Sequence, residues 1–149
     1  MDGVLNFFQT TPAIGTSGQP TREQFGQIGA AGYEVVVNLA MPDSEDALED
    51  EGSLVAKAGM VYVNIPIPFD APRPWHLARF IAVMDGFKDD RVWVHCQVNA
   101  RVSAFMFKYM TGVRGAVPET VTSPLLTAWR DRMDDVWKDV MSWDVESLD

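Results

Sequence analysis

The segment VHCQVNARVSAF contains the two residues best suited to chemistry, Cys96 and Arg101. It lies between an apolar β-branched run, RVWV, and a helix-like run, VSAFMFKYM. A helix that begins near Arg101 directs unpaired N–H groups and the positive end of its dipole into the preceding loop, which then forms an anion cradle. Such a cradle favours the thiolate of a cysteine, and a guanidinium adds two parallel donors for an oxyanion. The pair therefore predicts a thiolate nucleophile, Cys96, in an anion-binding loop.

The alternative for Cys96 is a small buried hydrophobic residue at the end of a strand, as most lone cysteines are. That interpretation leaves Arg101 unexplained, because an arginine five residues later lies in a turn that is at least partly buried. For His95 we expect packing and a hydrogen bond under the loop, and no role in proton transfer.

Three β-branched runs have the length of strands: 33–39 (YEVVVNL), 60–67 (MVYVNIPI) and 91–95 (RVWVH). Helix start and stop signals separate them. The expected helices run from a Thr21 cap to Gly32, from a Ser44 cap to about Ala58, from Pro74, from near Arg101, and from the Ser123–Pro124 pair. The first start has a capping-box pattern, with Gln24 three residues after Thr21.

The last expected helix carries one apolar stripe, which indicates core packing rather than a partner groove. The stripe consists of Leu126, Trp129, Met133, Val136, Trp137 and Val140.

Alternating strands and helices predict an α/β fold: a three-layer domain with a central, largely parallel sheet flanked by helices. The 149 residues are expected to form one domain, 1–149. In such sheets ligands bind beyond the carboxyl ends of the strands, where HCQVNAR is placed. The position of Cys96 is therefore informative before any motif is considered.

Composition excludes several classes of function. The formal net charge of −9 disfavours nucleic acid and anionic membranes as partners. No run approaches the ~18 apolar residues of a membrane span, and the N-terminus lacks the basic start of a signal peptide; we expect a cytoplasmic protein. One cysteine and two histidines predict no disulfide, metal or other cofactor. The acidic run from Asp43 to Glu51 is interpreted as a solvated loop and helix start.

HCQVNARVS resembles the signature of the cysteine-dependent protein tyrosine phosphatase superfamily, which is His-Cys, five residues, Arg, then Ser or Thr. Two features depart from that signature: only four residues separate Cys96 from Arg101, and the loop has no glycine. Asn99 is the expected substitute for glycine at a left-handed position, because asparagine tolerates positive φ better than most residues.

The chain is more closely similar to bacterial phosphatase-like proteins related to the beta-lactamase-hydrolase-like proteins. The similarity covers roughly residues 16–107, through TSGQPTREQF, AGYEVVVNLAMPDSE, MVYVNIPI and VHCQVNARVSAF. It implies a dual-specificity-phosphatase-like fold and tolerance of the shortened Cys-x4-Arg loop. We interpret Ser17 to Pro20 (SGQP) as a structural turn without a catalytic role.

The resemblance implies a hydrolase of phosphomonoesters, of the tyrosine or dual-specificity phosphatase type, in which Cys96 forms a thiophosphate intermediate. The implied phosphate-binding loop and substrate contacts are Gln97, Val98, Asn99, Ala100, Arg101 and Ser103. Ser103 has the position of the hydroxyl that, in the resembled enzymes, hydrogen-bonds the cysteine sulfur; bonding back to a helix carbonyl is the alternative. Asp70, in PIPFDAPRP, has the position of the general acid, although a turn aspartate is an equal alternative and Asp43 a weaker candidate.

Two other functions remain open. A loop of six residues from Cys96 to Arg101 has the length found in rhodaneses, so Cys96 is also a candidate carrier of sulfane sulfur; relatives fused to persulfide dioxygenases point the same way. A loop without glycine is also compatible with a catalytically weak module that binds a small oxyanion. The natural substrate and the oligomeric state are not determined by the sequence.

Overall fold

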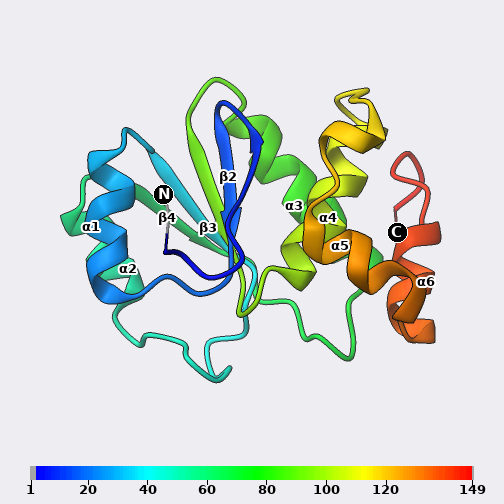
Figure 1. The fold of residues 1–149 in the computed structure, drawn as a ribbon, viewed down its shortest axis with the longest axis horizontal. Coiled ribbons are helices and arrows are strands. Elements are labelled where there is room, and N and C mark those ends of the chain that lie inside the picture. The colour runs from blue at the N-terminus through cyan, green and yellow to red at the C-terminus, as the bar shows by residue number, and fades with distance from the viewer. Residues whose placement is uncertain (1–2, 149) are drawn as a thin grey trace.

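The computed structural model describes residues 3–148, in which a five-stranded sheet forms the centre of the molecule (Figure 1). The spatial order of the strands is β1-β2-β5-β3-β4. Their bounds are Phe8–Thr11 (β1), Ile14–Ser17 (β2), Val35–Asn38 (β3), Val61–Asn64 (β4) and Val92–His95 (β5). Only the β1–β2 pair is antiparallel; β2–β5, β5–β3 and β3–β4 are parallel. The predicted largely parallel sheet is therefore confirmed.

Helices cover both faces of the sheet (Figure 1). One face carries α1 (Arg22–Ala30) and α2 (Glu51–Lys57). The other carries α3 (Pro74–Gly86), α4 (Ala100–Gly112), α5 (Pro124–Trp129) and α6 (Asp135–Ser142). Short 3₁₀ turns occupy Pro118–Thr120 and Arg130–Arg132. No helix within residues 3–148 has both the length and the apolar composition needed to cross a membrane.

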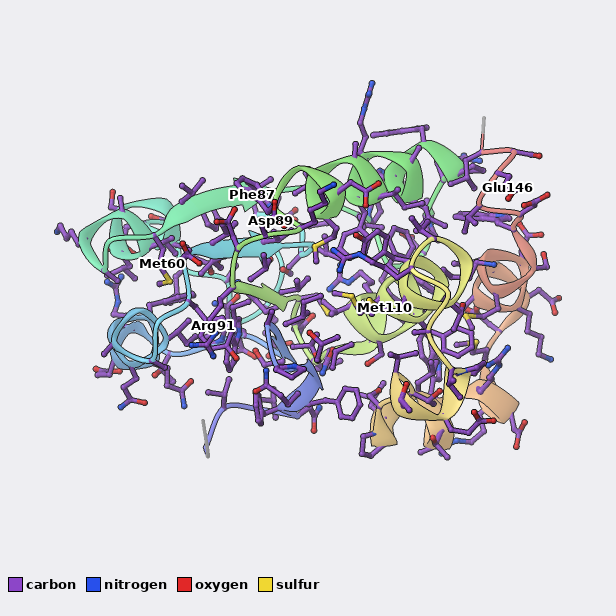
Figure 2. The ribbon with its side chains drawn as sticks, turned by 90° about the horizontal axis from the view of Figure 1, so that it is seen from above. Met60, Phe87, Asp89, Arg91, Met110 and Glu146 are labelled. Atoms are coloured by element: carbon purple, nitrogen blue, oxygen red, sulfur yellow. The ribbon has the colours of Figure 1, made fainter. Side chains whose placement is uncertain are left out.

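The two faces have separate hydrophobic cores, because successive strand side chains point to opposite sides. Val36 and Trp93 pack with residues of α1 and α2, whereas Val35, Val37 and Val94 pack with the helices of the other face. In Figure 2, Met60 lies on the side of α1 and α2, and Met110 lies among the helices of the opposite layer, which consists of α3 to α6. The continuous apolar composition of β3 and β5 is thus explained by burial on both faces.

Several local predictions are confirmed. Thr21 caps α1 with the complete capping box, and Gly32, at φ +96°, follows the helix. Pro74 begins α3 in the first turn, and Ser123 caps α5 by accepting from the Leu126 amide. These signals depend on residues close in sequence, so they need no knowledge of the tertiary fold.

The helix expected from Ser44 is wrong at its start. Helix α2 begins at Glu51, although it ends near Ala58 as expected. The Ser44 hydroxyl donates to the Met41 carbonyl and closes a turn, and Asp46 takes a left-handed conformation at φ +70°. Both features interrupt a helix before residue 51.

The single last helix is also wrong, because two helices replace it. Met133 is extended, with φ −60° and ψ 142°, and the Asp134 carboxylate caps α6 by accepting from the Trp137 amide. The break turns Val136 outward, where it is 37% exposed, while Leu126, Met133, Trp137 and Val140 stay buried. The hairpin of β1 and β2 is a further difference, since no strand was expected before residue 33.

Candidate active site

Cys96 follows β5 directly and begins the loop that enters α4. Strand β5 pairs in parallel with β2 on one side and β3 on the other, so the loop emerges at the carboxyl ends of the central strands. This is the edge where ligands bind in open α/β sheets. The amides of the first turn of α4, which have no partners within the helix, lie at the end of the loop.

A pocket of about 260 Å³ brings together most of the predicted site residues. Its lining residues are Phe69, Cys96, Gln97, Val98, Ala100 and Arg101. Cys96 is fully buried, whereas Phe69 and Val98 are 44% and 43% exposed. A buried thiol therefore lines this pocket together with two exposed apolar side chains.

Arg101 lines this pocket and has a buried nitrogen, Nε, without a hydrogen-bond partner among the described residues. The residue is only 5% exposed, and one terminal guanidinium nitrogen (Nη1) donates to the Ile67 carbonyl at 2.8 Å. The guanidinium carbon lies 5.8 Å from the centre of the Phe69 ring. Within residues 3–148, Arg101 Nε is buried and has no hydrogen-bond partner. A buried charged donor without a partner is costly, and an oxyanion in the pocket is a suitable acceptor for it.

Asn99 shapes the loop. Its φ is +78°, the left-handed conformation expected from the sequence. Its side-chain amide donates to the Asn6 carbonyl at 2.8 Å and to the Thr16 hydroxyl at 3.4 Å. The Asn6 amide in turn donates to the Val98 carbonyl at 2.9 Å. Asn99 thus supplies the positive φ usually given by glycine and also attaches the loop to the N-terminal segment.

Asn99 and Ser103 were expected to contact substrate, but neither is among the residues that line the pocket. The Ser103 hydroxyl donates to the Asn99 side-chain oxygen at 3.2 Å and shares a 2.7 Å hydrogen bond with the Ser123 hydroxyl. None of its hydrogen bonds within the described chain reaches the Cys96 sulfur. Ser103 therefore supports the loop from behind, through Asn99.

His95 lies under the loop, as expected, but its partner was missed. His95 Nε2 is 2.6 Å from Glu51 Oε2, and His95 Nδ1 is 3.2 Å from the Cys96 carbonyl oxygen. Both side chains are buried, at 0% and 3% exposure. The interpretation of the run from Asp43 to Glu51 as solvated is therefore wrong for Glu51, whereas Glu49 and Asp50 are exposed.

The turn from Ser17 to Pro20 contacts the loop and the buried acid together. The Gln19 amide donates to the Gln97 carbonyl at 2.9 Å, and the Gln19 side chain donates to Glu51 Oε1 at 2.8 Å. Gly18 permits this approach, because a Cβ there would lie 2.7 Å from the Gln97 carbonyl oxygen. The turn is structural, as expected, and it positions the loop.

Asp70 is exposed and follows Phe69, which lines the pocket, but Asp70 itself is not among the lining residues. Asp43 is also exposed, in the loop after β3. The geometry thus joins Cys96 with Arg101 and leaves the general acid unplaced. Residues 3–148 contain no group of three or more His, Cys, Asp and Glu side chains placed to share a metal ion.

Searches with family models and with curated proteins returned no match for this chain. Among solved structures, one named "putative phosphatase (DUF442)" from Shewanella putrefaciens CN-32 is 34% identical, with a TM-score of 0.85 over 94% of this chain and 91% of that chain.

More distant structures share the fold. The P. aeruginosa protein TpbA in complex with pTyr has a TM-score of 0.72 at 18% identity, over 97% of this chain and 88% of its own. The catalytic domain of the PP-IP phosphatase SIW14 from S. cerevisiae, in complex with citrate, has a TM-score of 0.68 at 12% identity, over 98% and 86% of the two chains. Identities this low establish the fold alone, which is that of the cysteine-dependent, tyrosine-phosphatase-like proteins.

The 34% identity to the S. putrefaciens protein, over nearly the full length of both chains, establishes more than a fold. This chain belongs to the DUF442 family, a group of phosphatase-like proteins in the cysteine-dependent protein tyrosine phosphatase superfamily.

Proposed function

We propose that this protein hydrolyses phosphomonoesters through a thiophosphate intermediate on Cys96. One observation carries the proposal: Cys96 and Arg101 line the same pocket, and the buried Nε of Arg101 has no hydrogen-bond partner within residues 3–148. A phosphate in the pocket supplies the missing acceptor, and the amides of the loop and of the first turn of α4 supply further donors.

In the first step the Cys96 thiolate attacks phosphorus in line with the leaving oxygen. An S–P bond forms, the P–O bond to the leaving group breaks, and that oxygen takes a proton from a carboxylic acid. Arg101 and the loop amides stabilise the three equatorial oxygens, on which the charge of the transition state is spread.

In the second step water attacks the phosphorus of the thiophosphate. A P–O bond forms, the S–P bond breaks, and the carboxylate accepts the proton of the water while Cys96 leaves as a thiolate. We assign the acid and base role to Asp70, on the resemblance to phosphatases that carry the acid in the corresponding loop. Asp70 is exposed and follows Phe69, which lines the pocket, and this neighbouring position supports the assignment.

The mouth favours a phosphoryl group attached to an aromatic or apolar body. Phe69 and Val98 are exposed beside the pocket, and none of the loops that line it is long. The complexes of TpbA with pTyr and of SIW14 with citrate show that related folds accept oxyanion ligands of different shapes. We therefore infer a shallow site of the dual-specificity type.

The test is hydrolysis of p-nitrophenyl phosphate and phenyl phosphate by the wild type and by Cys96→Ser. Since the chain has one cysteine, alkylation followed by mass spectrometry reports Cys96 alone. We expect phosphate to slow alkylation of the wild type, and we expect Cys96→Ser to abolish turnover. A wild type that hydrolyses neither ester, and whose alkylation ignores phosphate, contradicts the proposal.

Asp70→Asn tests the acid, with Asp43→Asn as the matched control on the other candidate loop. A general acid matters most when the leaving group is poor. Asp70→Asn should therefore slow phenyl phosphate far more than p-nitrophenyl phosphate, while Asp43→Asn leaves both unchanged. The opposite pattern would transfer the role to Asp43.

Sulfur transfer is the second candidate, favoured by the six-residue loop and by the absence of Asp70 from the lining residues. In that reaction the Cys96 thiolate attacks the outer sulfur of thiosulfate, an S–S bond forms, and sulfite leaves. Cyanide then takes the outer sulfur as thiocyanate and releases the Cys96 thiolate. This route needs no general acid, so thiosulfate turnover that survives in Asp70→Asn, without phosphatase activity in the wild type, would favour it.

A further inference from the structure

A buried chain of hydrogen bonds behind the Cys96 loop is not used by the proposed mechanism. Glu51 Oε2 lies 2.6 Å from His95 Nε2, and His95 Nδ1 lies 3.2 Å from the carbonyl oxygen of Cys96. Glu51 Oε1 accepts from the Gln19 side chain at 2.8 Å, and the backbone N–H of Gln19 donates to the Gln97 carbonyl. One carboxylate is thus linked to two successive carbonyls of the loop, to that of Cys96 through the His95 ring and to that of Gln97 through the side chain and the backbone N–H of Gln19.

The acceptors in this chain determine where the protons of His95 lie. A carbonyl oxygen only accepts, so a hydrogen bond to Cys96 requires a proton on Nδ1. If Glu51 is ionised, its carboxylate also only accepts, and the contact then places a proton on Nε2. The geometry is satisfied when both ring nitrogens are protonated and Glu51 is ionised, since a buried charge is tolerated when a partner neutralises it.

We propose that Glu51 is a positioning residue for the Cys96 loop, which holds His95 as an imidazolium whose Nδ1–H fixes the Cys96 carbonyl. Glu51 does not touch the pocket, so it acts through His95. This inference rests on the proposed function only in taking Cys96 as the nucleophile.

The imidazolium also affects the charge of the nucleophile. His95 contacts the backbone of Cys96 directly, whereas Glu51 reaches that backbone only through His95. An adjacent positive charge favours the thiolate form of a cysteine. Arg101 and the amides of α4 act from the opposite side of the loop.

The other groups around the pair do not compete for its proton. Strand β4 contributes Tyr62, whose pKa is raised to about 12, chiefly by burial, so that its phenol stays neutral. Helix α1 contributes the ring of Phe25, 5.9 Å from the His95 ring, and the turn before α1 contributes the uncharged amide of Gln19. Among the described residues, Glu51 is the acidic side chain that contacts His95.

Glu51→Gln separates the charge from the scaffold. A glutamine can donate its amide N–H to His95 Nε2 and accept from Gln19 through its oxygen, while a neutral His95 keeps Nδ1–H on the Cys96 carbonyl. Every hydrogen bond survives in this variant, and only the imidazolium is lost. Glu49→Gln is the matched control, because it makes the same chemical change on an exposed side chain two residues away.

The experiment measures the alkylation rate of Cys96 against pH in the wild type, Glu51→Gln and Glu49→Gln. We expect Glu51→Gln to shift the midpoint of the profile to higher pH and to slow alkylation at low pH on the order of tenfold, the effect of losing one nearby positive charge. We expect Glu49→Gln to match the wild type. An unchanged midpoint in a folded Glu51→Gln protein would overturn the proposal.

A second measurement needs no variant. The ring ¹⁵N shifts of His95 in the wild type at pH 7.5 should show protons on both nitrogens, whereas His76 should show one. An unprotonated Nε2 on His95 would place the shared proton on Glu51 and would refute the imidazolium. If phosphate fails to slow alkylation of the wild type, the proposed phosphatase function is contradicted. The ¹⁵N spectrum of the His95 ring still tests whether Glu51 holds His95 as an imidazolium.

Discussion

The two sides of the loop from Cys96 to Arg101 differ in how their polar groups are satisfied. The front faces the pocket of about 260 Å³ and holds a buried thiol and a guanidinium whose Nε has no partner among the described residues. The back is filled by two hydrogen-bonded networks, one centred on His95 and the other on Asn99. The fold thus fixes the shape of the loop from behind and keeps the donors at the front for a ligand.

This contrast assigns different consequences to mutations on the two sides. Under the proposed function, changes at the front remove interactions with substrate, and we expect them to lower kcat/KM with little effect on the free energy of unfolding. Changes at the back leave buried polar groups without partners, so they lower the free energy of unfolding first. The four predictions below test that division, from the largest expected effect to the smallest.

Arg101→Lys is expected to have the largest effect on activity. Lysine can still donate to the Ile67 carbonyl, but it lacks the planar pair of donors that binds two oxygens of a phosphate. We expect kcat/KM for p-nitrophenyl phosphate to fall about 100- to 1000-fold, while the urea midpoint changes little. Arg79→Lys, on an exposed face of α3, is the control and should match the wild type. A large loss of stability in Arg101→Lys would show that the front is structural as well.

Replacing Asn99 tests the back of the loop through stability. Asn99→Gly removes a buried network, at a cost of about 1–3 kcal/mol in the free energy of unfolding. Asn99→Ala loses the same network and in addition has about 1–2 kcal/mol of strain at φ +78°. The glycine variant has no such strain, but its unfolded chain is more flexible, which offsets part of the difference between the two variants. We therefore expect the alanine variant to be the less stable by roughly 0.5–1 kcal/mol in urea unfolding. Equal stability would mean that the loop relaxes to a negative φ.

The hydrogen bond between Ser103 and Ser123 should give a smaller effect. Ser123→Ala removes the cap of α5 and should lower the free energy of unfolding by about 1 kcal/mol. The Ser103 hydroxyl is hydrogen-bonded to the Ser123 hydroxyl. The double variant Ser103→Ala/Ser123→Ala should therefore lose less free energy of unfolding than the sum of the losses in Ser103→Ala and Ser123→Ala. A urea-unfolding double-mutant cycle measures this coupling, and Ser53→Ala on the exposed side of α2 is the control. If the losses of the two single variants simply add in the double variant, Ser123 is not energetically coupled to Ser103.

The second buried histidine sharpens the comparison with His95. Burial, helped by the charge of Arg73, lowers the pKa of His76, whose Nδ1 accepts from the Arg73 amide at 2.9 Å. A histidine whose pKa is lower in the folded state is neutral in both states at high pH. As pH falls through the ordinary histidine value of about 6.5, the unfolded state binds the proton first and stability decreases.

We therefore expect the urea midpoint of the wild type to fall relative to that of His76→Gln as the pH is lowered from about 7.5 to 5.5. The alkylation profile of Cys96 should not change in that variant, because His76 belongs to the first turn of α3 and not to the loop. An equal pH dependence in both proteins would exclude His76 as the cause.

The parts of the site that followed from the sequence depend on local patterns. The run RVWVH and the apolar helix after it place Cys96 at a strand end and Arg101 in the first turn of α4. The left-handed conformation of Asn99 was predicted because the loop has no glycine and asparagine tolerates positive φ. Each of these inferences uses residues within one strand–loop–helix unit.

The parts that were missed depend on partners far away in the chain. Glu51 is one acid in an acidic run, and its burial follows from His95, 44 positions later. Strand β2 is a run of four residues, IGTS, that contains a glycine, and it becomes a strand because β1 and β5 lie on either side. The break before α6 had a local signal, since Asp134 lies three residues before Trp137, but the continuous apolar stripe hid it.

The central position of β5 has a consequence for how the molecule folds. Ile14 of β2 pairs with Val92 of β5, so the middle of the sheet joins chain segments that are distant in sequence. At ribosomal synthesis rates of about 5–20 residues per second, β5 is synthesised on the order of ten seconds after β2, so the two strands cannot pair before then. The loop is then completed by residues from both ends of the chain, such as Asn6 and Ser123. Local helices are therefore expected to form early, whereas the Cys96 loop is completed late, together with the long-range contacts that make folding slow.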